Sequence, residues 1–298
     1  MRLDTVVVGM DFSPTATAVA GWVAHSFAPQ AKLALVHAIE PPARPSFLVA
    51  DTLPAEALEA DARGEAMDRL HEAARSLGPN VARLDVRVGR AADVIRVFAV
   101  DACADLIVVG PHGNRAHRSV VLGTTADSLV REAPAPVLVG LRAPLRGLKR
   151  VIAGVIDTAV ATRVLAWANV ATRQLGGPLT ALFAIEPAAY AHMASVIAAR
   201  SHGDMAIEQR ELDRERRLQV QHWLTECTHA NLDPSMVDVV VQEGLASEVI
   251  LQRAADERAA LIVLGGHENV AGLPPRLGTT VRTILHEARC AVLVVPPA

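Results

Sequence analysis

The chain has 298 residues, 51% of them hydrophobic and 3% aromatic, and a formal net charge of −3. This length favours two domains over one, and the composition allows packed cores built from aliphatic side chains. The negative charge argues against a nucleic-acid partner, because binding to a phosphate backbone favours a basic surface.

The three cysteines, Cys103, Cys227 and Cys290, are widely spaced and include no CxxC pair. This spacing argues against a zinc ribbon and a thioredoxin-like site, and it predicts reduced thiols in the cytoplasm. The eleven histidines form no HxxxH or HExxH pattern, so we expect no dedicated zinc site. The first residues resemble a strand rather than a signal peptide, and no run of ~20 apolar residues predicts a membrane span.

Strands alternate with helices along the first half of the chain. The predicted strands cover residues 5–9, 31–39, 81–88, 106–109 and 137–139. The predicted helices cover residues 14–27, 53–77, 92–102 and 124–132, and Ser13 followed by Pro14 is the N-cap of the first. Such alternation predicts an α/β fold with a parallel sheet and right-handed crossovers.

The same pattern starts again after residue 148, which indicates an internal duplication. Matching pairs are separated by 146 residues early in the repeat (Asp11 and Asp157, Ala38 and Ala184) and by 155 residues later (Gly89 and Gly244, Gly110 and Gly265). The change in offset predicts a nine-residue insertion in the second copy between residues 188 and 243, where residues 188–229 have helical character. Trp22 and Trp167, which are 145 residues apart, are near-equivalent and predict helix packing. We therefore expect domains at residues 1–142 and 149–298.

The run of apolar residues 106–109 ends at Gly110, and Gly113 and then Gly123 follow, with Thr124 and Thr125 opening the next helix. Glycine lets a backbone N–H approach an anion closely, and a helix N-terminus offers unpaired N–H groups. This stretch predicts a phosphate-binding loop, although the glycines could be ordinary turn residues and the threonines could be helix caps.

Asp11 follows the first strand, at the sheet edge where open parallel sheets bind ligands. It could accept a hydrogen bond from a ribose or an adenine, or it could cap the next helix. Combined with the glycine pattern, we favour the ligand contact. For His37, in the second strand, we favour packing inside the protein.

The spacing Gly110, two residues, Gly113, nine residues, Gly123 and Thr124 resembles the nucleotide signature of the universal stress protein family, in its tandem form. The resemblance covers nearly the whole chain. It implies a Rossmann-like five-stranded parallel sheet of order 3-2-1-4-5, duplicated in tandem with helices on both faces. It also implies that the last strands of the two domains pair as an intramolecular pseudo-dimer, and it leaves a homodimer of whole chains open.

In the ATP-binding branch of that family, adenine and ribose lie near the first two strands and the phosphates lie on the glycine loop. The cofactors implied are ATP, or another adenine nucleotide, and Mg²⁺. The binding residues implied are Gly9, Asp11, Ala38, Val109, Gly110, Gly113, Arg115, Gly123, Thr124 and Thr125. Arg115 could screen phosphate charge or could belong to a solvated loop tip.

The second copy departs from this pattern. It keeps Gly265, Gly278, Thr279 and Thr280, and Asp157 is a weaker candidate, but Glu268 replaces the second signature glycine. A carboxylate there would repel phosphates, although Glu268 could instead turn outward or help to hold a metal. Because Gly9 matches Val155 at the offset of 146, we also expect added bulk beside the nucleoside in the second copy. The sequence thus predicts one intact site and one degraded site.

Neither a Walker A lysine nor a nucleophile elbow is visible. The first hypothesis is a cytoplasmic stress-response or regulatory protein that binds ATP with Mg²⁺ in its first domain and signals by occupancy. A second hypothesis is an enzyme that slowly hydrolyses ATP or transfers an adenylyl group. A third is an interaction scaffold that binds no nucleotide.

Overall fold

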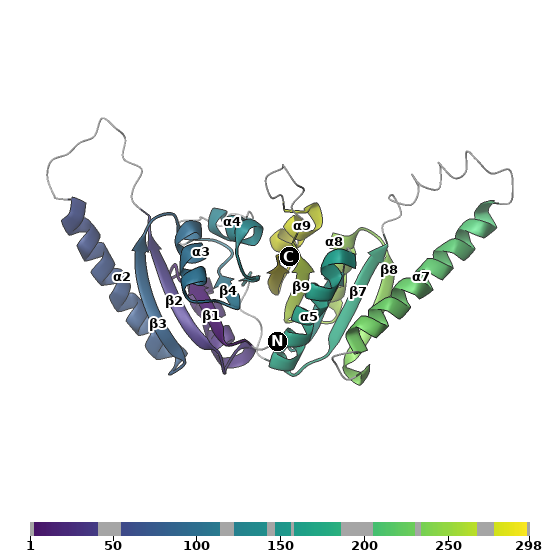
Figure 1. The fold of residues 1–298 in the computed structure, drawn as a ribbon, viewed down its shortest axis with the longest axis horizontal. Coiled ribbons are helices and arrows are strands. Elements are labelled where there is room, and N and C mark those ends of the chain that lie inside the picture. The colour runs from purple at the N-terminus through teal and green to yellow at the C-terminus, as the bar shows by residue number, and fades with distance from the viewer. Residues whose placement is uncertain are drawn as a thin grey trace, which may run out of the picture.

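The computed structural model describes residues 3–40, 55–113, 122–141, 147–155, 158–185, 205–229, 234–266 and 277–296. Its strands are β1 (Thr5–Gly9), β2 (Lys32–Ile39), β3 (Val81–Val88), β4 (Leu106–Val109), β5 (Val137–Val139), β6 (Val151–Val155), β7 (Leu179–Ile185), β8 (Val237–Glu243), β9 (Leu261–Gly265) and β10 (Ala291–Val295). Its helices are α1 (Pro14–Trp22), η1 (Val23–Phe27), α2 (Ala55–Leu77), α3 (Ala91–Asp101), α4 (Thr124–Glu132), α5 (Thr158–Leu175), α7 (Met205–His229), η2 (Pro234–Met236), α8 (Ala246–Asp256) and α9 (Thr279–Glu287). Figure 1 shows the two halves side by side, the first in purple and blue and the second in green and yellow.

All ten strands form one sheet, in the order β3-β2-β1-β4-β5-β10-β9-β6-β7-β8. Within each half the strands are parallel, and each half has the predicted order 3-2-1-4-5, which is confirmed. All residues of β4 and of β6 are buried, as expected for parallel strands that helices cover on both faces.

The two halves meet at the only antiparallel strand pair described in this sheet, between β5 and β10. Leu138 lies opposite Leu293, with Val137 opposite Val294 and Val139 opposite Val292. The predicted pairing of the last strands is therefore present. It covers two edges whose backbone N–H and C=O groups would otherwise lack partners.

Helices cover both faces of the sheet, and each face carries one hydrophobic cluster. On one face α1, α2, α5 and α7 contribute buried side chains such as Leu70 and Leu165. On the other face α3, α4, α8 and α9 contribute buried side chains such as Phe98 and Ile284. Both clusters contain residues of both halves, so the core continues across the β5–β10 pair.

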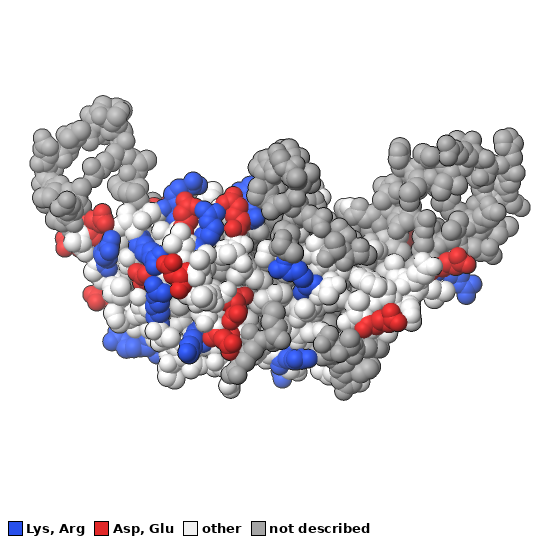
Figure 2. Space-filling model, in the orientation of Figure 1, with Lys and Arg blue, Asp and Glu red and all other residues white. Residues whose placement is uncertain are grey.

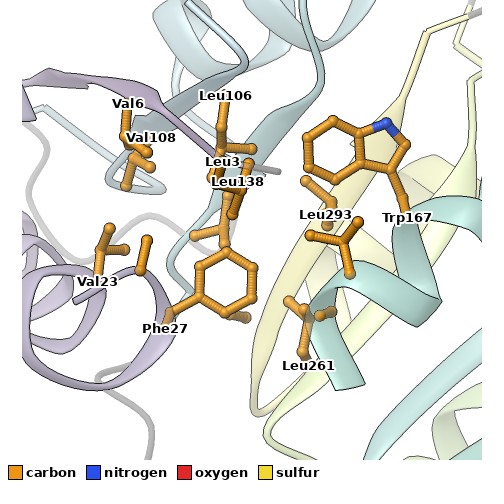
Figure 3. Close-up of a cluster of buried hydrophobic side chains, with 14 of the residues drawn as sticks. Leu3, Val6, Val23, Phe27, Leu106, Val108, Leu138, Trp167, Leu261 and Leu293 are labelled. Atoms are coloured by element: carbon orange, nitrogen blue, oxygen red, sulfur yellow. The ribbon is translucent and has the colours of Figure 1, made fainter. Parts of the chain in front are cut away.

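Phe27 lies in the part of the core where side chains of the two halves meet. Its ring is completely buried, and Figure 3 shows Phe27 and Val23 of the first half on one side of Leu138, with Leu293 and Trp167 of the second half on the other. The side chains that join the halves are thus part of a close-packed core rather than of a polar interface.

The first helix begins where it was predicted, and only the type of its last turn differs. The Ser13 hydroxyl accepts a hydrogen bond from the Ala16 N–H at 3.1 Å, and Pro14 follows at the first helical position. The predicted end near Phe27 is correct, but the last turn is π-helical, with the Ala28 N–H donating to the Val23 carbonyl at 2.8 Å. This wider turn carries the Phe27 ring, which stacks on Trp22 with 5.2 Å between the ring centroids.

Other boundaries differ slightly from the prediction. The second strand begins at Lys32, and α3 spans Ala91–Asp101 instead of residues 92–102. Of the helical region expected at residues 188–229, the structure describes α7 (Met205–His229), which packs on β8 and α5. None of the helices in the described ranges is both long enough and apolar enough to cross a membrane.

We predict that Phe27→Ala lowers the free energy of unfolding by about 3–5 kcal/mol, because it removes a fully buried ring from the core that both halves share. Urea denaturation followed by circular dichroism should show one transition, shifted as a whole to lower urea. Val97→Ala is the control, because Val97 is 53% exposed on α3 and its truncation should cost less than about 0.5 kcal/mol. Two separate transitions in the variant would contradict a shared core.

We also predict that the cysteines differ in reactivity. Burial raises the pKa of the Cys290 thiol to about 12, whereas Cys103 is exposed. At pH 8 a disulfide reagent should modify Cys103 in the folded protein and Cys290 only after unfolding, because the thiolate is the nucleophile.

The raised pKa of Cys290 also makes the stability of the protein depend on pH. The Cys290 thiol stays protonated in the folded protein, while an unfolded thiol ionises near pH 8.5. Stability from this group is thus complete below about pH 8.5 and falls as the pH rises toward about 12. Cys290→Ala should flatten the fall between pH 8 and pH 10 in denaturation experiments; an unchanged slope would show that another group causes it.

Candidate functional site

The predicted residues of the first half gather at the carboxyl end of the sheet. β1 lies between β2 and β4, with Gly9 beside Val36 and Val8 beside Val108. The ends of these three strands are therefore neighbours, and they carry Gly9, Asp11, Ala38, Val109 and Gly110. α4 begins next to them with Gly123, Thr124 and Thr125, while Arg115 lies outside the described residues.

The two ends of the glycine loop are held together after β4. The Gly123 N–H donates a hydrogen bond of 2.7 Å to the Pro111 carbonyl. A Cβ on Gly123 would lie 3.0 Å from that carbonyl oxygen and 3.2 Å from the Cα of His112. A side chain would press on the backbone of the loop here, so packing favours glycine at position 123.

Neither a close contact with a described residue nor the backbone angle requires glycine at positions 110 and 113. Neither has a positive φ, so no left-handed turn demands glycine at either position. A Cβ on Gly110 would be in ordinary contact with Ala16 at 3.7 Å, and a Cβ on Gly113 would meet no described atom within 4 Å. Backbone conformation and the described contacts therefore do not call for glycine at either position, and both would permit the close approach of a ligand to the backbone.

α4 also differs from α1 and α3, which follow β1 and β3 at the same edge of the sheet. The N-terminus of α1 is capped by the Ser13 hydroxyl, and at α3 the Glu40 carboxylate accepts the Ala91 N–H at 3.0 Å. α4 begins at Gly123, with no side-chain cap among the described residues, and its first helical bond runs from the Asp127 N–H to the Gly123 carbonyl.

The first three N–H groups of α4, on Thr124, Thr125 and Ala126, therefore precede the helical bonds. The Thr124 side chain is exposed and that of Thr125 is half-buried. Such N–H groups and the positive end of the helix dipole suit an anion, and they lie next to Gly110 and Gly113. Nearby, Nε2 of His112 is buried without a hydrogen-bond partner in the described part of the chain.

Asp11 has the capping role that the sequence left open. Its Oδ1 accepts a hydrogen bond of 2.8 Å from the Ser13 N–H. Among the described residues no donor reaches Oδ2. The side chain is half-buried, so one carboxylate oxygen belongs to the turn and the other is available to a ligand.

The turn that holds Asp11 contains features that the sequence analysis missed. Phe12 has a φ of +60°, which is rare for a bulky residue and costs about 1–3 kcal/mol. Its ring lies 4.6 Å from the His37 ring and 4.2 Å below the Arg69 guanidinium of α2. His37 packs inside the protein, as we favoured. No sequence signal indicated the left-handed conformation of Phe12 or its contact with Arg69.

The second half corrects the predicted match between Gly9 and Val155. Val6 pairs with Leu106 in the first half, and Val151 pairs with Leu261 in the second, so the offset of the first strand is 145 residues. At this offset Gly9 corresponds to Gly154. The prediction of added bulk at Val155 is therefore wrong.

The surroundings of the two glycines support the new match. A Cβ on Gly9 would lie 2.6 Å from Cδ1 of Ile95, and a Cβ on Gly154 would lie 2.6 Å from Cδ1 of Ile250, the residue equivalent to Ile95. Packing against the third helix of each half thus explains both glycines. The second strands are offset by 146 residues, so the second half has one extra residue between β6 and β7.

The described pairing of β6 ends at Val155. Asp157 and Glu268 lie outside the described residues. The match of Asp157 with Asp11 and the place of Glu268 in the loop therefore stay predictions.

The remaining residues of the second copy keep part of the pattern. Gly278 precedes α9, whose first turn contains Thr279 and Thr280, with backbone angles close to those of Gly123. Gly265 differs from Gly110, because a Cβ there would lie 2.7 Å from Cγ1 of Val160. Packing thus explains Gly265, and the space beside it is filled by protein.

Comparison with known proteins agrees with the duplicated architecture. The family model described as "Universal stress protein family" matches residues 2–140 and again residues 147–296. A universal stress protein of Thermus aquaticus is 38% identical over 132 residues, which cover 44% of this chain and 90% of that protein. A universal stress protein of Mycobacterium tuberculosis strain H37Rv is 28% identical over 302 residues, which cover 98% of this chain and 96% of that protein.

A solved structure has the same fold over the full length. The universal stress protein from Archaeoglobus fulgidus DSM 4304 superimposes with a TM-score of 0.69 and 16% identity, and the match covers 100% of both chains. Two family matches that together span both halves leave no ambiguity about descent. The chain belongs to the universal stress protein family and carries two of its domains in tandem.

Proposed function

We propose that this protein binds one adenine nucleotide, ATP with Mg²⁺, in its first half, and acts as a stress-response module that signals by occupancy. The observation that carries the proposal is the pair Gly110 and Gly113, which neither φ nor contact with a described residue explains, next to a start of α4 that no described side chain caps. Backbone N–H groups at such a place suit phosphate oxygens.

The nucleoside would lie over the ends of β1 and β2. The free Oδ2 of Asp11 suits a ribose hydroxyl or an adenine N–H, because a carboxylate accepts hydrogen bonds strongly. Ala38 is half-buried at the end of β2 and presents a small apolar surface to a base. Among the described residues no group of three or more His, Cys, Asp or Glu side chains could hold a metal ion. We therefore propose that Mg²⁺ enters with the phosphates, which with water can supply its oxygen ligands.

We propose that the second half does not bind nucleotide in this way. Val160 fills the space beside Gly265. A glutamate, Glu268, stands where the second loop glycine would be. The expected stoichiometry is one nucleotide per chain.

The charge distribution supports a small ligand rather than a nucleic acid. Figure 2 shows basic side chains mixed with acidic ones over the first half, without a continuous basic surface on this face. Arg96, for example, is paired with Asp93 and Glu132, and Arg131 with Asp127. The three cysteines are free thiols, which supports a reducing compartment such as the cytoplasm.

The first experiment is to denature freshly purified protein, analyse the released nucleotides, and titrate the stripped protein with ATP and Mg²⁺ by calorimetry. We expect one site per chain. Phosphate release over hours, measured on the same sample, distinguishes occupancy from slow hydrolysis. The absence of both bound nucleotide and ATP binding would overturn the proposal in favour of an interaction scaffold.

We predict that Gly113→Glu weakens ATP binding by about tenfold or more, because it places a carboxylate beside the phosphates. The variant should fold, since a Cβ at Gly113 meets no described atom within 4 Å. Gly64→Glu is the matched control, because Gly64 is exposed on α2 and a Cβ there also meets nothing within 4 Å. Equal affinities for the two variants would show that the loop does not bind the phosphates.

We predict that two substitutions at Asp11 separate its two roles. Asp11→Asn keeps an oxygen for the Ser13 N–H but loses the charge, so it should leave the melting temperature unchanged and weaken ATP binding several-fold. Asp11→Ala should weaken ATP binding similarly and also lower stability by about 1 kcal/mol through loss of the cap. If both variants bind ATP like the wild type, Asp11 only caps the turn.

A further inference from the structure

The turn that bears Asp11 is held in an unfavourable backbone conformation. Phe12, directly after Asp11, has a φ of +60°. Such a conformation persists in a bulky residue only where the surrounding structure imposes it. The contacts around Phe12 therefore determine where the Asp11 carboxylate lies.

The first contact comes from β2, on the near side of Asp11. The Met10 N–H donates to the Val36 carbonyl at 2.9 Å, and Nδ1 of His37 lies 2.6 Å from the Met10 carbonyl oxygen. Because a carbonyl oxygen only accepts, Nδ1 must carry the proton and donate it. The backbone on the N-terminal side of Asp11 is thus tied to β2 through both groups of Met10.

The second contact comes from α2, on the far side of Asp11. The Arg69 guanidinium carbon lies 4.2 Å from the centroid of the Phe12 ring, which is the geometry of a cation–π contact. Arg69 is exposed and has no ion pair among the described residues, whereas Arg63 on the same helix pairs with Glu59. The aromatic ring is therefore the described partner of the Arg69 charge.

His37 links the two contacts, since its ring also lies 4.6 Å from the Phe12 ring. Phe12 is half-buried and packs against the core cluster beneath α1 and α2. The three side chains, which we call the Phe12 stack (Phe12, His37 and Arg69), therefore fix the chain on both sides of Asp11.

We propose that the Phe12 stack positions Asp11 for nucleotide binding, so that Arg69 of α2 controls the affinity of a site which it does not touch. This inference rests on the proposed function. Phe12, His37 and Arg69 are positioning residues, because they act through the Asp11 carboxylate and not on the phosphates.

The second half offers a natural comparison. In the second half Val155 pairs with Phe183. In the first half the equivalent neighbours are Met10 and His37. A phenylalanine thus occupies the position of His37 in the second half. A phenylalanine ring cannot donate a hydrogen bond to the carbonyl of the residue equivalent to Met10. The second half thus lacks the hydrogen bond that ties the Met10 carbonyl to β2 in the first half.

The test compares Arg69→Met with Arg63→Met, two substitutions that remove one exposed arginine each from α2. Affinity is measured by calorimetry for two probes, Mg·ATP and Mg·tripolyphosphate; the second has phosphates but no nucleoside. We expect Arg69→Met to weaken ATP binding about three- to tenfold. Tripolyphosphate binding and the melting temperature should stay unchanged, and Arg63→Met should behave like the wild type.

Substitutions of Phe12 give an independent measurement. Phe12→Tyr keeps the ring and should bind ATP like the wild type, while Phe12→Leu should lose about tenfold in ATP affinity and little for tripolyphosphate. If Phe12→Leu fails to fold, the surface substitution Arg69→Met still decides.

The outcomes distinguish the two proposals. Wild-type protein that binds no ATP overturns the proposed function and this inference with it. Wild-type protein that binds ATP, with Arg69→Met binding equally well, overturns only the positioning role. A parallel loss for ATP and tripolyphosphate in Arg69→Met would also overturn it, because the effect would not then act through the nucleoside side of the site.

Discussion

The antiparallel pair of β5 and β10 is the contact on which the rest of this molecule depends. β5 has only three residues, yet it joins two five-stranded sheets into one of ten strands. The pairing satisfies the backbone groups of two edges, and it places the helices of both halves over continuous hydrophobic clusters. Phe27 shows the consequence, since a residue that ends the first helix of one half is buried among side chains of the other. The interface between the two halves is therefore part of a common hydrophobic core.

Three kinds of glycine occur around the candidate site, and they carry different information. At Gly123 a side chain would press against the Pro111 carbonyl, and at Gly9 it would meet the end of the Ile95 side chain. At Gly110 and Gly113 neither the backbone angle nor a contact with described residues favours glycine. Their place after β4, next to the start of α4, distinguishes them from surface glycines such as Gly64 on α2. This separation is more informative than the spacing of the glycines, because a spacing treats all of them alike.

The two copies have diverged by filling space and not by changing the fold. The sheet order, the glycine before the fourth helix and the two threonines after it are retained in the second half. What differs is the immediate surroundings of the loop, where Val160 occupies the volume beside Gly265. An aliphatic side chain in that place keeps the core packed. Both halves contribute to the shared core, so each half supports the packing of the other.

The sequence by itself determined the fold class, the strand order through its family resemblance, the duplication and most element boundaries, because these depend on local hydrophobic patterns and turn residues. It also located the loop from Gly110 to Thr125 and the acid Asp11. It could not determine the register of β6. In a strand buried on both faces every position is apolar, so a slip of one residue leaves no mismatch in the pattern. The spacing of 145 residues between Trp22 and Trp167 was the one sign of the correct register. Only the tertiary structure decided that Gly154 matches Gly9, and that Phe12, His37 and Arg69 meet beside Asp11. Those contacts join elements distant in the chain, and their geometry arises only when the sheet and its helices have packed together.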